Sequence, residues 1–218
     1  MTKWGRMLRF HKQAEGCGQE LGKAARIVVL PAAFNPPTIA HQAIAARAAE
    51  EADRVLLLMP EQMPHKRFDG ASYEQRIAML SRLAEEGPYT VCSTSAGLFV
   101  DIAAACHTAY PEAQIAIACG RDAAERAMLW RYENSDTLSR LFDLAELWVF
   151  ARQGQVATPT PWKNRIRHFD MDEALQAVAA TAIRERLRRG EDWKDWVPAA
   201  IHTMVAEIYA EFGDRNRD

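Results

Sequence analysis

The feature of this sequence that most limits its fold is an alternation of short apolar runs with longer segments of helical spacing. Five runs have the length of buried strands rather than of independent helices: residues 27–30, 54–59, 89–92, 114–119 and 146–150. Helical segments lie between them at residues 39–52, 73–86, 99–110 and 138–141. A last strand is expected at residues 165–169, before two C-terminal helices. This order predicts a Rossmann-like, doubly wound α/β fold, in which helices cover both faces of a mostly parallel sheet.

The chain length fits one domain with small additions, because 218 residues are enough to bury a sizeable core. We expect the folded domain to span residues 26–218. Residues 1–25 are polar and include several glycines, so we expect an N-terminal arm that is partly ordered or carries a short helix at residues 4–12. Residues 153–162, which contain two prolines, are expected to form a loop.

The charge of the chain disfavours large anionic partners. Its net charge is -2, which gives no general attraction to nucleic acid or to an anionic membrane. The basic run at residues 184–189 is interrupted by Glu185 and followed by Glu191 and Asp192, so nucleic-acid binding is a weak alternative. Any phosphate site must therefore arise from local placement, which favours small-molecule nucleotides as partners.

The cysteines and the apolar runs bear on cellular location. The four cysteines (Cys17, Cys92, Cys106 and Cys119) are scattered and contain no C-x-x-C pair, so we interpret them as free thiols in a reducing compartment. No apolar run reaches membrane-spanning length, and residues 1–21 lack the apolar core of a signal peptide. We expect a cytoplasmic protein with no membrane partner.

The segment after the first strand is the first candidate site, because ligands of such sheets bind beyond the carboxyl ends of the strands. Small residues at Ala32 and Ala33 allow a ligand to approach the backbone. Asn35 and two prolines form a rigid turn, and Thr38 is well placed to cap a helix whose first N–H groups would attract an anion. His41, one turn later, would lie beside that anion. The alternative is an ordinary Pro-rich turn with a solvated histidine.

Residues 34–41 read F-N-P-P-T-x-x-H, which resembles the nucleotidyltransferase signature G-x-F-[DN]-P-x-[HT]-x-x-H. The resemblance implies that His41 contacts the phosphates of ATP and that Thr38 assists. It also implies an ATP-binding loop that includes Ala33, Phe34 and Asn35. One residue departs from the signature, because Ala32 replaces its leading glycine and places a methyl group where backbone and phosphate meet.

Two further segments match the same family in order and spacing. Pro64-His65-Lys66 resembles its P-P-H-K element, and residues 76–80 match the R-x-x-M-L that follows. Lys66 is a flexible point charge suited to a phosphate, although an exposed basic loop is the alternative. Residues 178–184 resemble I-S-x-T-x-I-R, which implies that Thr181 and Arg184 bind the ATP phosphates. Ala179 replaces the family serine.

The helix around Arg184 is the weakest point of this match. Residues 173–189 are an unbroken run of helix-forming residues without an evident N-cap. A continuous helix would use its N–H groups internally and leave none for phosphate. The resemblance leads us to expect a break near Ala180.

The acceptor side is suggested by the segment after the run at residues 114–119. Residues 119–122 read C-G-R-D and resemble the family element G-A-D, with a family tryptophan eight residues later at Trp130. The resemblance implies that Gly120, Asp122 and Trp130 face the acceptor, where Trp130 could stack on a pyridine ring. Residues 144–154 resemble L-x-x-L-V-V-x-x-R-P-G, which adds Arg152. A helix N-cap at Asp122 and core packing of Trp130 are the alternatives.

Together these segments resemble the nicotinate/nicotinamide mononucleotide adenylyltransferases. The resemblance implies transfer of AMP from ATP to the mononucleotide in NAD biosynthesis, with release of pyrophosphate and with Mg²⁺ bound to ATP. Thr38, His41, Lys66 and Arg184 would act by positioning and charge neutralisation, without a nucleophilic side chain. The alternatives are another acceptor such as phosphopantetheine, or a non-catalytic nucleotide-binding protein, which the substitutions at Ala32 and Ala179 suggest.

Overall fold

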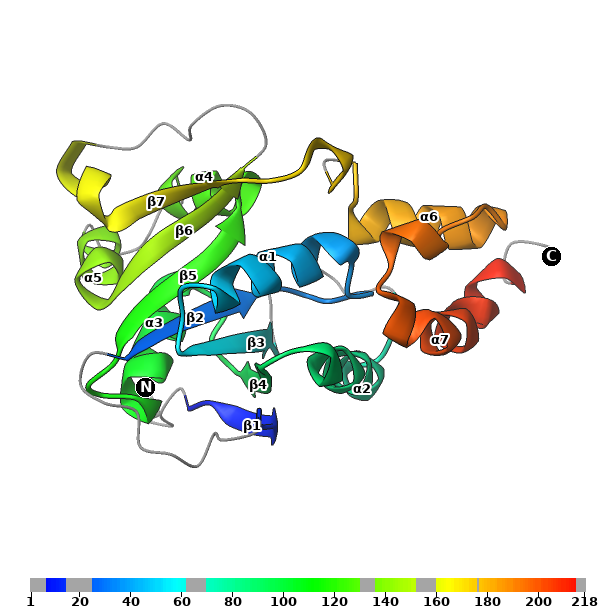
Figure 1. The fold of residues 1–218 in the computed structure, drawn as a ribbon, viewed down its shortest axis with the longest axis horizontal. Coiled ribbons are helices and arrows are strands. Elements are labelled where there is room, and N and C mark those ends of the chain that lie inside the picture. Colours follow the sequence, from blue (N-terminus) through cyan, green and yellow to red (C-terminus); the bar gives the residue numbers. More distant parts are fainter. Residues whose placement is uncertain are drawn as a thin grey trace.

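The computed structural model describes residues 7–14, 25–61, 70–129, 136–151, 160–175 and 177–214. Within these residues, seven strands form one sheet in the order β1-β4-β3-β2-β5-β6-β7 (Figure 1). Their bounds are β1 (Arg9–Lys12), β2 (Arg26–Pro31), β3 (Arg54–Pro60), β4 (Tyr89–Thr94), β5 (Gln114–Gly120), β6 (Ala145–Ala151) and β7 (Ile166–Asp170). Strands β2 to β7 pair in parallel, and β1 pairs antiparallel with β4. The strand order runs outward in both directions from β2 and β5, which confirms the doubly wound fold.

Side chains of the parallel strands feed two cores, one on each face of the sheet. Ile27, Val29 and other strand residues pack with α3 (Phe99–Ala109), α4 (Arg121–Leu129) and α5 (Thr137–Leu144). Alternate strand residues such as Val28 and Leu30 pack with α1 (Ile39–Ala49) and α2 (Tyr73–Leu83) on the other face. Because strand residues alternate in direction, both faces bury apolar side chains, as the continuous apolar runs require.

A third, smaller core lies beyond the carboxyl ends of the central strands. It joins α2 to α6 (Ala180–Arg189) and α7 (His202–Asp214), which Figure 1 shows past the ends of β2 and β3. Its buried members are Ala71, Met79, Ile183, Val197, Ile201, Val205 and Tyr209. Short 3-10 helices complete the described chain: η1 (Ala84–Glu86), η2 (Thr160–Arg165), η3 (Glu173–Leu175), η4 (Lys194–Trp196) and η5 (Ala199–Ile201). This core fixes α6 against the part of the sheet where ligands of such folds bind.

Two expectations about secondary structure need correction. The short helix considered at residues 4–12 is wrong for Arg9–Lys12, which form β1, because pairing with the exposed edge of β4 satisfies their backbone. Of the expected loop at residues 153–162, residues 153–159 lie outside the described residues, and residues 160–162 belong to η2, where Trp162 stacks on Phe142 with ring centroids 5.2 Å apart. A helix after residue 120 was implied only by the alternative of an N-cap at Asp122, and the structure forms α4 there. The boundary between arm and domain at residue 26 stays a prediction.

Two other expectations concern the cysteines and the membrane. Cys92, Cys106 and Cys119 are free, as expected, and all three are buried, which raises the pKa of the Cys106 and Cys119 thiols to about 12. Cys17 lies outside the described residues. No helix in the described part of the chain has both the length and the apolar character needed to cross a bilayer.

Candidate functional site

Hydrogen bonds from two neighbouring elements, β3 and α2, hold the backbone of the loop after β2. The Ala32 N–H donates to the Leu58 carbonyl of β3 at 3.1 Å. Arg76 of α2 is buried and donates through Nη1 to the Ala33 carbonyl at 3.1 Å and through Nε to the Ser72 carbonyl at 3.3 Å. Burial lowers the pKa of Arg76, and the nearby Tyr209, Tyr73 and Glu74 oppose this shift. The buried guanidinium of Arg76 thus donates to two backbone carbonyls and fixes the loop after β2 to α2.

Thr38 and His41 close the start of α1. Thr38 has an extended backbone and is buried, and its Oγ1 accepts a hydrogen bond from the His41 N–H at 3.3 Å. In return His41 Nδ1 accepts from the Thr38 N–H at 3.1 Å and lies 2.8 Å from Thr38 Oγ1. Because Nδ1 accepts from a backbone N–H, the proton of a neutral His41 ring lies on Nε2. The predicted N-cap at Thr38 is confirmed.

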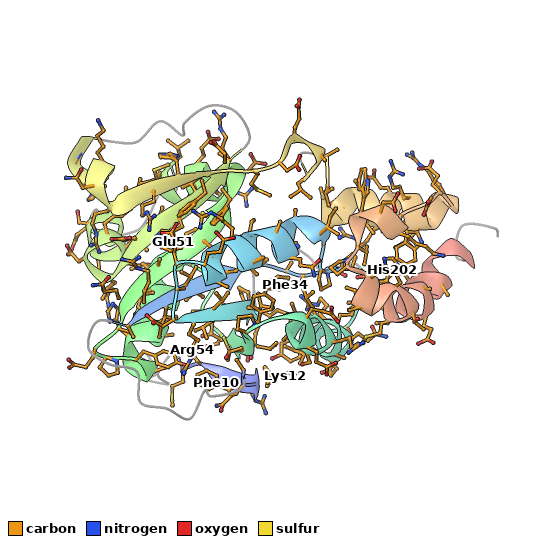
Figure 2. The ribbon with its side chains drawn as sticks, viewed as in Figure 1. Phe10, Lys12, Phe34, Glu51, Arg54 and His202 are labelled. Atoms are coloured by element: carbon orange, nitrogen blue, oxygen red, sulfur yellow. The ribbon has the colours of Figure 1, made fainter. Side chains whose placement is uncertain are left out.

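This capping box changes what α1 can offer to an anion. We expected the first N–H groups of α1 to point at the ligand, but the His41 N–H is already bonded to the Thr38 side chain. The His41 ring instead packs against buried Phe34, with ring centroids 4.9 Å apart. Phe34 itself has a φ of 48°, an uncommon conformation for a bulky residue. Figure 2 shows Phe34 near the carboxyl ends of the central strands, on the side of the C-terminal helices.

Helix α6 begins at Ala180, so the expected break is confirmed. Ala179 before it is extended, with φ −131° and ψ 138°, and no side chain of the described residues caps the helix. The first helical hydrogen bond found there runs from the Ile183 N–H to the Ala179 carbonyl at 3.0 Å. Thr181 is exposed in the first turn. The start of α6 therefore has the form of an anion site built from backbone N–H groups.

Arg184 joins the two motif segments. Its Nη1 donates to the Asn35 carbonyl at 2.6 Å, across 149 residues of sequence. Arg184 Nε is buried without a hydrogen-bond partner among the described residues. Gly70 lies against both residues, since an added Cβ would stand 2.8 Å from Asn35 Oδ1 and 3.2 Å from Arg184 Cδ, at a φ of +120°. Only glycine fits this crossing without displacing one of the two side chains.

The Asn35 side chain supports the loop from inside. Its Oδ1 accepts from the Ala71 N–H at 3.1 Å and from the hydroxyl of Tyr209 on α7, and Asn35 is 4% exposed. Contact between Asn35 and ATP stays a prediction.

Sequence reasoning missed Tyr209, Gly70 and the contact from Arg76 to the loop. The R-x-x-M-L match had pointed to Arg76, but no local pattern marked Tyr209.

The predicted acceptor residues lie in part at the point where strand order reverses. Strand β5 pairs in parallel with β2, so Gly120 at the end of β5 is on the same edge as the loop after β2. Helix α4 starts directly afterwards, with Asp122 exposed in its first turn rather than at the cap position. Lys66, Trp130 and Arg152 lie outside the described residues. Among the described residues, no group of three or more His, Cys, Asp or Glu side chains could hold a metal ion.

Known proteins resemble both the sequence and the fold. The profile of the cytidylyltransferase-like family matches residues 29–186, which include both motif segments. A probable nicotinate-nucleotide adenylyltransferase of Chromohalobacter salexigens is 28% identical, covering 89% of this chain and 100% of the relative. One from Anaeromyxobacter dehalogenans strain 2CP-1 is 30% identical, covering 83% and 94%.

A solved structure extends the likeness to the fold. It is the nicotinic acid mononucleotide adenylyltransferase of Plasmodium falciparum in complex with NaAD, which is 10% identical, with a TM-score of 0.67 over 85% of this chain and 98% of that one. At this identity the match concerns the fold alone. The family profile covers most of the chain and spans the two segments that Arg184 brings together. The chain therefore belongs to the cytidylyltransferase-like family, within the nucleotidyltransferases.

Proposed function

We propose that this protein transfers AMP from ATP to nicotinate mononucleotide and releases pyrophosphate, as a step of NAD biosynthesis in the cytoplasm. The observation that carries the proposal is the hydrogen bond from Arg184 to the Asn35 carbonyl, which brings the two predicted ATP segments to one edge of the sheet. The curated relatives, which carry the name of nicotinate-nucleotide adenylyltransferases, support this choice of acceptor.

In this proposal the triphosphate of ATP lies between the two helix starts. Thr38 and His41 belong to one side, where His41 Nε2 carries the proton of the neutral ring and can donate to a phosphate oxygen. Thr181, Arg184 and the uncapped N–H groups of α6 belong to the other side. The backbone of Ala33, Phe34 and Asn35 forms the floor, and Lys66 adds a further positive charge.

The acceptor is proposed to bind beyond the end of β5. Gly120 leaves space at the strand end, since no atom of the described residues lies within 4 Å of a Cβ added there. Asp122 is exposed nearby and can accept hydrogen bonds from ribose hydroxyls or nucleobase N–H groups. Trp130 and Arg152 complete this side in the proposal, the first by stacking on the pyridine ring and the second by pairing with an anionic group of the acceptor.

In the proposed reaction the protein acts mainly by positioning the two substrates, and no side chain forms a covalent bond to them. A phosphate oxygen of the mononucleotide attacks the α-phosphorus of ATP, a P–O bond forms, and the bond to the leaving pyrophosphate breaks. Both reactants are anions, so the barrier falls when donors and cations hold them together and neutralise charge. Mg²⁺ enters as part of the ATP substrate, held chiefly by phosphate oxygens and water.

The decisive experiment measures pyrophosphate release with ATP and Mg²⁺ against nicotinate mononucleotide, nicotinamide mononucleotide and phosphopantetheine. We expect the highest kcat/KM with nicotinate mononucleotide. Turnover with phosphopantetheine alone would reassign the acceptor. Binding of ATP without turnover of any acceptor would instead select the non-catalytic alternative that Ala32 and Ala179 suggest.

A further inference from the structure

Tyr209 on α7 contacts the proposed ATP loop, although it is far from that loop in sequence. Its hydroxyl donates to Asn35 Oδ1 across 174 residues, and the side chain is 2% exposed. Helix α7 lies outside residues 29–186, which the family profile matches. Tyr209 is therefore a structural neighbour of the site that none of the matched motifs contains.

Asn35 connects Tyr209 to Arg184. Its side-chain oxygen is held by Tyr209 and by the Ala71 N–H, whereas its backbone oxygen accepts from Arg184 Nη1 at 2.6 Å. A shift of Asn35 would therefore move the partner of Arg184 as well. Gly70 lies next to both residues, since a Cβ added to it would stand 2.8 Å from Asn35 Oδ1 and 3.2 Å from Arg184 Cδ.

The ring of Tyr209 packs in the same core as α6. Tyr209 and Ile183, the residue before Arg184, belong to one buried cluster that also contains Met79 and Val205. Burial raises the pKa of Tyr209, while Arg184, the Ala71 backbone and Arg76 act in the opposite direction. The net increase means that the phenol stays protonated near neutral pH and keeps its donor role. One side chain thus helps to fix both the loop after β2 and the helix that carries Arg184.

We infer that Tyr209 is a positioning residue whose hydroxyl holds Asn35 so that the loop after β2 and Arg184 form one preassembled site for a triphosphate. The inference rests on the proposed function for the identity of the ligand, but its geometry is independent of the acceptor. A preassembled site lowers the ordering that ATP binding would otherwise require. Tyr209 would then affect steps that involve ATP and leave the acceptor side unchanged.

The test replaces Tyr209 by phenylalanine, which keeps the ring in its cluster and removes only the hydroxyl. We expect kcat/KM for ATP to fall about tenfold, because small displacements of binding groups are costly. We expect the KM of the mononucleotide to stay unchanged. Amides of residues 32–38 should exchange hydrogen faster in Tyr209→Phe than in the wild type, because the loop has lost one internal bond.

Tyr110→Phe is the matched control. The Tyr110 hydroxyl accepts from Arg54 Nη1 at 3.3 Å at the start of β3, which is the edge of the sheet opposite the proposed site. Figure 2 shows Arg54 and Phe34 toward opposite ends of the sheet. This variant also loses one tyrosine hydroxyl, but neither ATP kinetics nor exchange of residues 32–38 should change.

Variants of Asn35 separate the hydrogen bond from general packing. Asn35→Asp keeps an acceptor oxygen and should retain more kcat/KM for ATP than Asn35→Leu, which has the same branching at Cγ and no acceptor. If Tyr209 acts through Asn35, adding Tyr209→Phe to Asn35→Leu should cause little further loss, because the two changes remove the same interaction. Additive losses would mean that Tyr209 acts by another route.

The readouts keep this inference apart from the proposed function. If the wild type releases no pyrophosphate with any acceptor, the proposed function fails, whereas loop exchange and affinity for a non-hydrolysable ATP analogue still judge Tyr209. Unchanged loop exchange and unchanged ATP affinity in Tyr209→Phe would overturn the inference. So would equal effects of Tyr209→Phe and Tyr110→Phe.

Discussion

Helices α1 and α6 both begin at the proposed triphosphate site, but their first turns are built differently. Before α1, Thr38 and His41 exchange hydrogen bonds and close a capping box. Before α6, Ala179 adopts the extended conformation of a cap residue but supplies no side-chain acceptor. One helix start is therefore closed by its own side chains, and the other has no side-chain cap within the described ranges of the chain.

If both helix starts bind the triphosphate as proposed, the difference corresponds to two modes of binding the same anion. At α1 the capping box uses a backbone N–H and fixes the His41 ring, so this helix offers a side-chain donor at Nε2. At α6 the proposed donors are backbone N–H groups, supplemented by the guanidinium of Arg184, which also donates to the Asn35 carbonyl. The signature with Thr and His thus builds a fixed ring, and the segment with Ala179 builds an open helix end.

Helix α2 supplies a reference for this comparison. Ser72 and Gln75 form a second capping box, in which Ser72 Oγ accepts from the Gln75 N–H and Gln75 Oε1 accepts from the Ser72 N–H at 2.8 Å. Both side chains are exposed and belong to no predicted binding element. A change in this box therefore reports capping without a predicted binding role, although a change at Ser72 also removes the bond from Ser72 Oγ to Glu74 Oε2 at 2.9 Å.

The largest effect is expected from His41→Ala. Removing the ring deletes the Nε2 donor, and we expect turnover to fall about a hundredfold or more, as for other lost transition-state donors. Gln75→Ala is the control, because Gln75 has the same place in the box of α2. Steady-state pyrophosphate release by the two variants gives the comparison. Unchanged release by His41→Ala would remove the histidine from the mechanism.

The next effect is expected from Gly70→Ala, which acts where the two regions meet. The added methyl group would stand 2.8 Å from Asn35 Oδ1 at a φ of +120°, so Asn35 or Arg184 must move. We expect a loss of stability of about 1–3 kcal/mol, typical of strain at such a position. Thermal unfolding measures it, and KM for ATP should rise at the same time. Gly190→Ala is the control, because Gly190 also has a positive φ, but an added Cβ there would meet no atom within 4 Å in the described part of the chain.

A weakened ATP interaction in Gly70→Ala with normal turnover of bound substrate would confirm that the crossing of Asn35 and Arg184 matters for binding. Equal stability losses in Gly70→Ala and Gly190→Ala, with ATP kinetics unchanged in both, would show that only backbone strain is involved. The crossing would then have no part in joining the two helix starts.

The parts of the fold that could be predicted from sequence are those that local pattern determines. The apolar runs that became β2 and β3 are buried on both faces, so their composition alone marks them as central strands. Thr38 has the residue type of a cap and starts its helix where expected. Strand β1 escaped prediction because its conformation depends on pairing with β4, about eighty residues away, as in the register of Phe10 with Cys92.

The candidate site divides in the same way. The break before Ala180 was expected from the resemblance and against the local propensity of residues 173–189, which favours a continuous helix. The contact of Tyr209 with Asn35 joins positions 174 residues apart, and no periodicity or spacing connects them. Gly70 could have been noticed as a glycine that precedes the Ser72 cap. The reason why only glycine fits there is the close approach of Asn35 and Arg184, which no local pattern shows.

Thr38→Ala should have a smaller effect than the changes above and would test the closed helix start directly. It removes the acceptor for the His41 N–H, and we expect a loss of about 1 kcal/mol in the free energy of unfolding. Ser72→Ala should lose a similar amount from the equivalent box of α2. Only Thr38→Ala should also lower kcat, because only there does the cap orient a proposed catalytic ring. Equal kcat values for both variants would reduce Thr38 to a structural cap.

The smallest effect is expected from Ala179→Ser, which would close the open helix start. Ala179 already has the extended backbone of a cap residue, so a serine hydroxyl there can accept from the N–H of Thr181 or Ala182. We expect about 1 kcal/mol of added stability in thermal unfolding without nucleotide. The KM of ATP should change by less than about threefold, since Arg184 and the other N–H groups remain.

Ligand binding sharpens this last comparison. If the open N–H groups of α6 bind phosphate, a non-hydrolysable ATP analogue should stabilise the wild type slightly more than Ala179→Ser, because the serine has already occupied one donor. A KM for ATP that falls tenfold or more in Ala179→Ser would instead show that a hydroxyl at this position binds phosphate itself. In that case the family serine would bind phosphate through its hydroxyl rather than cap the helix, and Ala179 would have removed that contact with ATP.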